Sequence, residues 1–135
     1  QWSELRSRAW EPEKWFAYDE GLCAALEKFR TSPQFLGICF ATNSPVDVGR
    51  RILNALGVAV ASNRVFGPEN IGCSKPDPRF FPSIADSLQV DFSQCISIGD
   101  RKMSDGDPAI AAGFRCAFIV EGRDDFIAAL RDLIT

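Results

Sequence analysis

Short apolar runs alternate with helix-like segments along almost the whole chain, and this alternation constrains the fold more than any other feature. The sequence predicts strands at residues 35–41, 64–67, 95–98 and 115–120, and helices at residues 21–30, 46–56, 78–88, 108–112 and 124–133. Strands that alternate with helices pair in parallel, because each helix returns the chain across a face of the sheet. The sequence therefore predicts an α/β fold, a doubly wound parallel sheet.

Composition and charge exclude several classes of protein. The chain has 135 residues, of which 46% are hydrophobic and 24% charged, with a formal net charge of −3. This length suits one domain with a sizeable core. No basic stripe marks a nucleic-acid surface, and no apolar run is long enough to cross a membrane. Histidine is absent, which excludes His-based catalytic triads and His-ligated zinc in these 135 residues.

The cysteines indicate the compartment. There are five, scattered without a Cys-x-x-Cys pair. Cys39, Cys95 and Cys116 lie in apolar runs, so they are expected to be buried, reduced thiols of a cytoplasmic protein. The first residues also lack the charged-then-apolar start of a secretory signal.

Two acids follow the predicted strand at residues 95–98. Gly99-Asp100 comes at its carboxyl end, and Asp105 stands on the same loop. Open α/β sheets bind their ligands at that edge, and two carboxylates there suit a hard cation such as Mg²⁺. The alternative is a solvated acidic loop in which Asp105 caps the next helix, since Asp favours N-caps.

A hydroxyl and a lysine fall at corresponding places. Thr42 ends the apolar run at residues 35–41, where its side chain can hold a phosphate oxygen; the alternative is that Thr42 or Ser44 caps the next helix, with Pro45 at its first position. Lys75 lies in a loop stiffened by Pro76 and Pro78, and can neutralise charge on a phosphoryl group. The alternative for Lys75 is a solvated surface lysine.

Taken in order, these residues resemble the motifs of the haloacid dehalogenase-like superfamily, in its phosphatase branch. The second family motif, a strand ending in Ser or Thr, matches ICFATNS at residues 38–44. The third, a lysine followed by Pro-Asp-Pro and a helix with Phe, matches KPDPRFF at residues 75–81. The fourth matches Gly-Asp at residues 99–100, with Asp105 and then Ala-Gly at residues 112–113. The resemblance implies a Rossmann-like core of the haloacid dehalogenase type.

The resemblance also implies roles for five residues. Thr42 and Asn43 would bind the phosphate, Lys75 would bind it and stabilise charge, and Asp100 and Asp105 would form a Mg²⁺ site. The implied activity is Mg²⁺-dependent hydrolysis of a phosphomonoester of a small phosphorylated metabolite, through an aspartyl-phosphate. Neither nucleic acid nor a membrane is an expected partner.

The family's first motif, Asp-x-Asp at the end of the central strand, has no match. Asp19 is too close to Thr42 in sequence, and Asp107 follows a loop. We expect residues 1–17 to be the end of a cap or linker and residues 18–135 to be the C-terminal part of the core, apparently without its first strand. The nucleophile would then lie upstream. Unpaired strand edges would face the gap, so an N-terminal segment or self-association would complete the sheet.

Two rival functions stay open. A catalytically inactive domain of this fold, acting as a binding or scaffold module, would account for the absent nucleophile but not for the retained site residues. Carbon–halogen hydrolysis fits less well, because dehalogenases of the superfamily lack the acid that stands here as Asp100. The substrate itself is not determined by these residues.

Overall fold

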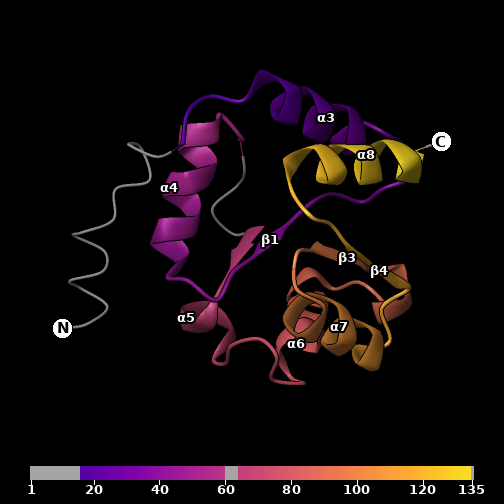
Figure 1. Ribbon diagram of the computed structural model, residues 1–135. Helices are drawn as coiled ribbons and strands as arrows, with labels where there is room; N and C mark the ends of the chain where they lie inside the picture. The colour runs from indigo at the N-terminus through magenta and orange to yellow at the C-terminus, as the bar shows by residue number, and fades with distance from the viewer. Residues whose placement is uncertain (1–15, 60–63, 135) are drawn as a thin grey trace.

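Strands and helices alternate in the computed structural model, which describes residues 16–59 and 64–134 (Figure 1). Their order is α3 (Glu20–Arg30), β1 (Phe40–Ala41), α4 (Val46–Leu56), β2 (Val65–Phe66), α5 (Pro68–Ile71), α6 (Phe80–Leu88), β3 (Ile96–Gly99), α7 (Asp107–Ala112), β4 (Cys116–Ile119) and α8 (Arg123–Ile134). A 3₁₀ turn (Phe92–Gln94) precedes β3, and a π-helical turn (Lys102–Gly106) precedes α7. Every strand and helix predicted from residue 16 onward has a counterpart here, whereas α5 was not predicted. All but the last two residues of the expected cap or linker end, residues 1–17, lie outside the described residues.

The strands form two separate parallel pairs. In the first pair, Phe40 and Ala41 of β1 lie opposite Val65 and Phe66 of β2. In the second pair, β3 and β4 align from Ile96 opposite Cys116 to Gly99 opposite Ile119. Within the described residues no strand ladder joins the two pairs. The predicted strand at residues 35–41 is therefore much shorter than expected, because only its last two residues have a strand partner.

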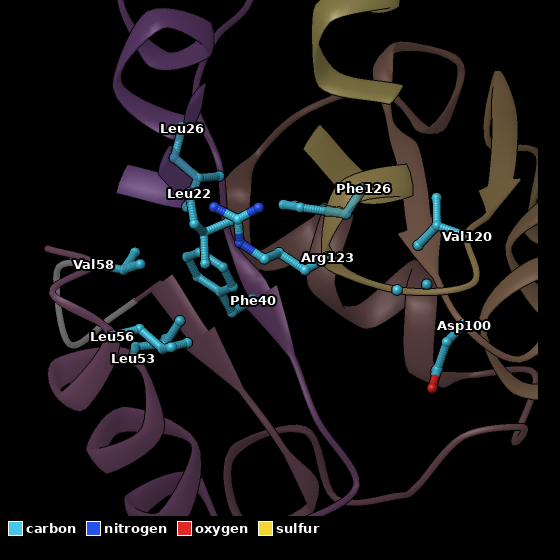
Figure 2. Close-up of a pocket in the computed structure, with 12 residues that line it drawn as sticks. Leu22, Leu26, Phe40, Leu53, Leu56, Val58, Asp100, Val120, Arg123 and Phe126 are labelled. Carbon is cyan, nitrogen blue, oxygen red and sulfur yellow. The ribbon is translucent and has the colours of Figure 1, made fainter. Parts of the chain in front are cut away.

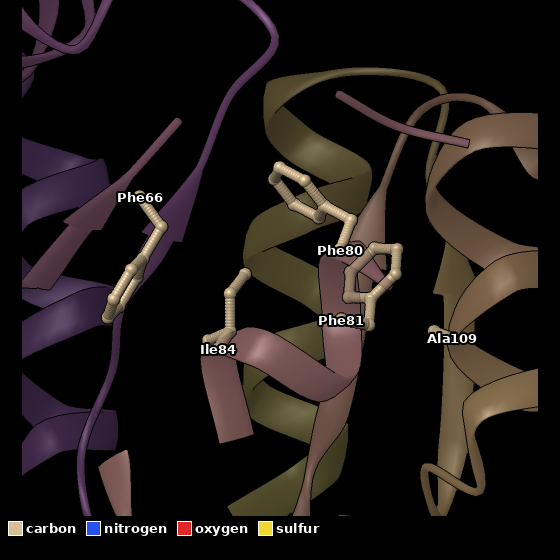
Figure 3. Packing of buried hydrophobic residues seen from close by; sticks show 5 residues of the cluster. All are labelled: Phe66, Phe80, Phe81, Ile84 and Ala109. Carbon is tan, nitrogen blue, oxygen red and sulfur yellow. The ribbon is translucent and has the colours of Figure 1, made fainter. Parts of the chain in front are cut away.

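Alternate residues near β1 face opposite sides of the sheet, as the two-residue period of a strand requires. Cys39 and Ala41 pack against the first core cluster, whose buried members are Phe66, Phe80, Phe81, Ile84 and Ala109 (Figure 3). Ile38 and Phe40 pack against the second, which contains Leu26, Phe29 and Leu130 from α3 and α8. Helices α6 and α7 thus cover one face, and α3 and α8 the other (Figure 1).

Two glycines end their helices. Gly57 after α4 and Gly113 after α7 both have positive φ, 84° and 99°, a conformation that residues with a Cβ rarely adopt. No helix in the two described ranges combines the length and apolar character that a bilayer span requires.

The cysteines differ from the expectation in one respect. All five lie in the described ranges as free thiols, but each is partly exposed rather than buried. Burial raises the pKa of the Cys39 thiol to about 11.

An apolar cavity of about 290 Å³ lies between the two strand pairs. Phe40 of β1 and Asp100 after β3 lie on opposite sides of it, and side chains of α3, α4 and α8 form much of the rest of its wall (Figure 2). We call this space the slot. Among the described residues, the charged ones that line it are Asp100 and Arg123.

Candidate active site

Thr42 continues the line of β1 into a tight turn. Its backbone N–H donates to the carbonyl of Phe66 (2.9 Å), which extends the parallel ladder by one bond. Its hydroxyl oxygen accepts from the N–H of Ser44 (2.9 Å). A hydroxyl that accepts one bond still has its own hydrogen to donate. Thr42 therefore presents a free O–H donor, as judged from the described residues, at the carboxyl end of β1.

Helix α4 is not capped by Thr42 or Ser44. It begins at Val46 after Pro45, and the residue at the N-cap makes no side-chain bond. The N–H of Val46 donates instead to both carboxylate oxygens of Glu69, at 3.0 and 3.3 Å. A carboxylate at a helix N-terminus satisfies an otherwise unpaired donor and complements the helix dipole. The capping alternative for Thr42 is therefore wrong, and Glu69 has the structural role instead.

Lys75 is an ion-paired, largely buried lysine. Its Nζ lies 2.6 Å from Oδ1 of Asp105, and the side chains of Lys75 and Asp105 are only 12% and 9% exposed. The ammonium also lies 6.0 Å from the ring centre of Phe80, within the range of a cation–π contact. The solvated-surface alternative for Lys75 is wrong, because its charged end points inward to Asp105, an acid of the turn that follows β3.

Asp105 is held from several sides. Its second carboxylate oxygen accepts from the N–H of Arg101 (3.2 Å), and its carbonyl accepts from the buried hydroxyl of Ser97 (2.7 Å). A Cβ at Gly99 would collide with the Asp105 side chain, so the glycine leaves room for this acid. Helix α7 begins two residues later without a side-chain cap. The helix-cap alternative for Asp105 is therefore wrong.

Asp100 follows β3 directly and is exposed. Its carboxylate makes no hydrogen bond or ion pair with any residue in the described ranges. Figure 2 places it at the rim of the slot, with the carboxylate turned away from the aliphatic side chains. No group of three or more His, Cys, Asp or Glu that could hold a metal occurs in the part of the chain that the structure describes. Among the described residues, Asp100 and Asp105 are the carboxylates after β3 that a cation could use.

Asn43 joins the loop after β1 to the Lys75 loop. Its side-chain oxygen accepts from the N–H of Lys75 (2.8 Å), and its side-chain nitrogen donates to the carbonyl of Lys75 (3.0 Å). The Lys75–Pro76 peptide bond that follows is cis. Asn43, Lys75 and Asp105 thus form one connected chain of contacts, and Thr42 is the immediate neighbour of Asn43.

Asp19 is committed elsewhere. Its carboxylate accepts from the N–H of Leu22 (3.0 Å), which caps α3, and from two nitrogens of Arg123 (2.6 and 2.8 Å). The Arg123 guanidinium lowers the pKa of Asp19 to about 2, and the bond from Leu22 acts in the same direction. An acid with both oxygens occupied is a poor nucleophile, which agrees with its exclusion on sequence spacing.

Two supporting residues were not predicted from the sequence. Ser97 is the single polar residue in an apolar strand, a pattern that marks a buried hydrogen bond. Glu69 follows Pro68 just after a predicted strand, a combination typical of a first helical turn. The sequence shows both features, but it does not show that Ser97 bonds to Asp105 or that Glu69 bonds to Val46.

Comparison with known proteins places the chain in a family. The family model described as haloacid dehalogenase-like hydrolase matches residues 2–113. A phosphoglycolate phosphatase of Cereibacter sphaeroides is 32% identical over 102 residues, which cover 76% of this chain and 44% of that protein. A phosphoglycolate phosphatase of Rhodospirillum rubrum is 37% identical over 78 residues, covering 58% and 31%. The chain thus spans less than half the length of these curated relatives.

Solved structures agree on the fold. A HAD family hydrolase from Deinococcus radiodurans R1, with bound phosphate and sodium, superposes with a TM-score of 0.63 at 21% identity, over 83% of this chain and 51% of that one. A hydrolase from Pseudomonas syringae gives a TM-score of 0.58 at 19% identity, over 87% and 63%. Together with the family match, these likenesses show that the chain belongs to the haloacid dehalogenase-like hydrolases and has their Rossmann-like core.

Proposed function

We propose that this chain carries the phosphate-binding and cation-binding part of a Mg²⁺-dependent phosphomonoesterase that acts on a small phosphorylated metabolite. The observation that carries the proposal is the buried Lys75–Asp105 ion pair, which lies beside residues at the carboxyl ends of β1 and β3. The phosphoglycolate phosphatases among the relatives support a phosphate ester as substrate. Phosphoglycolate is therefore the first substrate to test.

The proposed roles follow from the charge of a phosphoryl group in transfer. Its equatorial oxygens carry negative charge, and catalysis consists mainly of positioning the group and offsetting that charge. The Lys75 ammonium supplies a fixed positive charge, and the Thr42 hydroxyl donates to a phosphate oxygen. Asp105 holds the ammonium in place through the 2.6 Å contact.

Asp100 is the proposed Mg²⁺ ligand. Mg²⁺ takes oxygen ligands, often one or two carboxylates, and keeps several waters. The exposed Asp100 carboxylate, which has no partner in the described ranges, fits that donor set. The Asp105 carboxylate is already bonded to Lys75 and to the N–H of Arg101. We therefore assign Asp105 to orienting the groups that bind the cation and the phosphate, and not to binding the cation directly. When bound, the cation would supply positive charge next to the phosphoryl oxygens.

We infer that the nucleophile is an aspartate outside this chain, on a strand that occupies the slot. The facing edges of β1 and β3 and the apolar slot wall support this. A carboxylate oxygen would bond to phosphorus while the ester P–O bond breaks, and the leaving alkoxide oxygen would take a proton from water to depart as the alcohol. Water would then attack the aspartyl-phosphate and release inorganic phosphate and the free aspartate.

The test is hydrolysis of phosphoglycolate and of an aryl phosphate by the complete gene product, with Mg²⁺ and with EDTA. Asp100→Asn should abolish Mg²⁺-dependent turnover while leaving the unfolding free energy unchanged. The matched control is Asp86→Asn, an exposed acid of α6, which should keep full activity. Undiminished turnover in Asp100→Asn would contradict the assignment. Phosphate binding without any turnover in the complete product would favour an inactive binding or scaffold domain.

A further inference from the structure

We propose that Asn43 is a positioning residue that holds the Lys75 backbone in register and does not itself bind phosphate. This inference rests on the proposed function, in which Lys75 offsets phosphoryl charge. It changes the role that the family resemblance implies for Asn43, from direct phosphate contact to support of the lysine.

The carboxamide of Asn43 is engaged at both ends. Its oxygen accepts from the Lys75 N–H at 2.8 Å, and its nitrogen donates to the Lys75 carbonyl at 3.0 Å. One residue of the Lys75 loop thus receives the same donor–acceptor pair that a neighbouring strand would offer. Two bonds to one residue determine both its distance and its orientation. Asn43 and Lys75 are 32 positions apart, so this contact ties two loops together.

The other end of Lys75 is equally constrained. Its ammonium is bonded to Asp105 and lies over the Phe80 ring. A lysine side chain loses considerable conformational entropy when it is ordered. A lysine restrained at its backbone and at its charged end has lost that entropy before substrate arrives, which is how preorganised sites gain rate.

A direct phosphate contact would compete with this arrangement. An anion approaching Asn43 needs the side-chain N–H₂ group, and one of its two hydrogens already points to the Lys75 carbonyl. The side-chain oxygen repels anions. Thr42 and the Lys75 ammonium offer better donors nearby. Asn43 therefore contributes through Lys75.

The decisive experiment is a double-mutant cycle on the complete gene product. Asn43→Ala should lower kcat by roughly 10- to 100-fold, because small misplacement of a catalytic group has effects of that size, and should change KM less than about twofold. In a Lys75→Ala background the same substitution should cause no further loss, because the ammonium to be positioned is absent. Ser44→Ala, at an exposed neighbouring position, is the matched control and should keep wild-type rates. A further tenfold loss in the Lys75→Ala background would overturn the proposal.

Two readouts do not depend on turnover. Hydrogen exchange at the Lys75 amide should become faster in Asn43→Ala and stay unchanged in Ser44→Ala. Inorganic phosphate, titrated calorimetrically with Mg²⁺ present, should bind Lys75→Ala and the double variant Asn43→Ala with Lys75→Ala equally well, because Asn43 acts through Lys75. Weaker phosphate binding by the double variant, with an unchanged Lys75 exchange rate in Asn43→Ala, would assign Asn43 to direct binding and refute the inference. If the wild-type product has no phosphatase activity, the proposed function fails. The exchange measurement still decides whether Asn43 restrains the Lys75 backbone.

Discussion

The β1–β2 and β3–β4 pairs differ in how they are held together. Strands of the first pair have two residues each, whereas those of the second have four. The second pair is extended by further backbone bonds at both ends, from Arg115 to Cys95 and from Val120 to Gly99. The first pair depends more on side chains, such as the Asn70 nitrogen on the Val65 carbonyl (2.9 Å). Where the backbone ladder is short, side-chain bonds hold the loops that form the site.

Lys75 connects the two pairs. Its backbone is tied to Asn43 after β1, and its ammonium is tied to Asp105 after β3. The slot separates the pairs, so this lysine is a polar connection across a region where the described chain has no strand ladder. A residue placed in this way is expected to affect both activity and stability.

The largest effect is expected from breaking that connection. Lys75→Ala should lower kcat by about 10²-fold or more, because a fixed electrostatic stabiliser is lost. It should also lower the unfolding free energy by roughly 3–5 kcal/mol, because Asp105 is left as an uncompensated, nearly buried charge. The Lys75 side chain is only 12% exposed, so its loss is expected to affect stability as well as activity. Urea unfolding and steady-state kinetics measure the two effects.

Two further variants sharpen that result. Lys28→Ala, an exposed lysine of α3, should change neither quantity. The double variant Lys75→Met with Asp105→Leu should recover most of the stability without any activity, since a buried pair can be replaced by apolar residues. An unchanged unfolding free energy in Lys75→Ala would mean that the Lys75–Asp105 ion pair does not hold the β1–β2 and β3–β4 pairs together.

A smaller effect is expected within the first pair. Glu69→Ala should lower stability by about 1 kcal/mol, the usual value of a helix cap, because the Val46 N–H loses its acceptor. Glu69→Gln should cost less, since a neutral carbonyl oxygen remains but the charge facing the helix N-terminus is lost. Equal stability of Glu69→Ala and wild type in urea unfolding would show that water replaces the cap. Phosphatase turnover provides a second readout of whether the cap also supports the Thr42 turn.

The smallest effect concerns the ion pair between the two helices on one face of the sheet. Asp19 has a folded pKa of about 2 against a usual 3.8, so its charge stabilises the folded state above pH 3.8. That contribution is lost as the pH falls from 3.8 through 2, where the carboxylate becomes protonated. Arg123→Gln should therefore reduce the fall in Tm between pH 4 and pH 2, which thermal unfolding at low ionic strength measures. An identical pH profile in wild type and variant would contradict the assignment.

Local patterns predicted much of the fold. Helix α4 has the predicted bounds, and α7 ends at the predicted residue, Ala112. Helix α6 begins two residues later than predicted, at Phe80, because the Asp77 carboxylate accepts from the Arg79 N–H and forms a separate turn first. These features depend on neighbours a few positions apart, which a sequence displays directly.

Strand length was the main structural error. The apolar run at residues 35–41 has the composition of a buried strand, yet only Phe40 and Ala41 belong to one. Phe35 stacks instead on Phe29 of α3, with ring centres 4.1 Å apart. A strand exists only where a partner offers hydrogen bonds, and the sequence of one segment does not specify how long its partner is.

The sequence by itself determined the order of the elements, the parallel pairing and the placement of Thr42, Lys75 and Asp100 in loops or at strand ends. Periodicity and turn residues carry that information locally. Only the tertiary structure decided that Lys75 pairs with Asp105, that Asn43 faces the Lys75 backbone, and that an apolar slot separates the strand pairs. These contacts join residues some 30 positions apart, so they depend on how the helices pack around both strand pairs at once, a property of the whole chain that no local pattern contains.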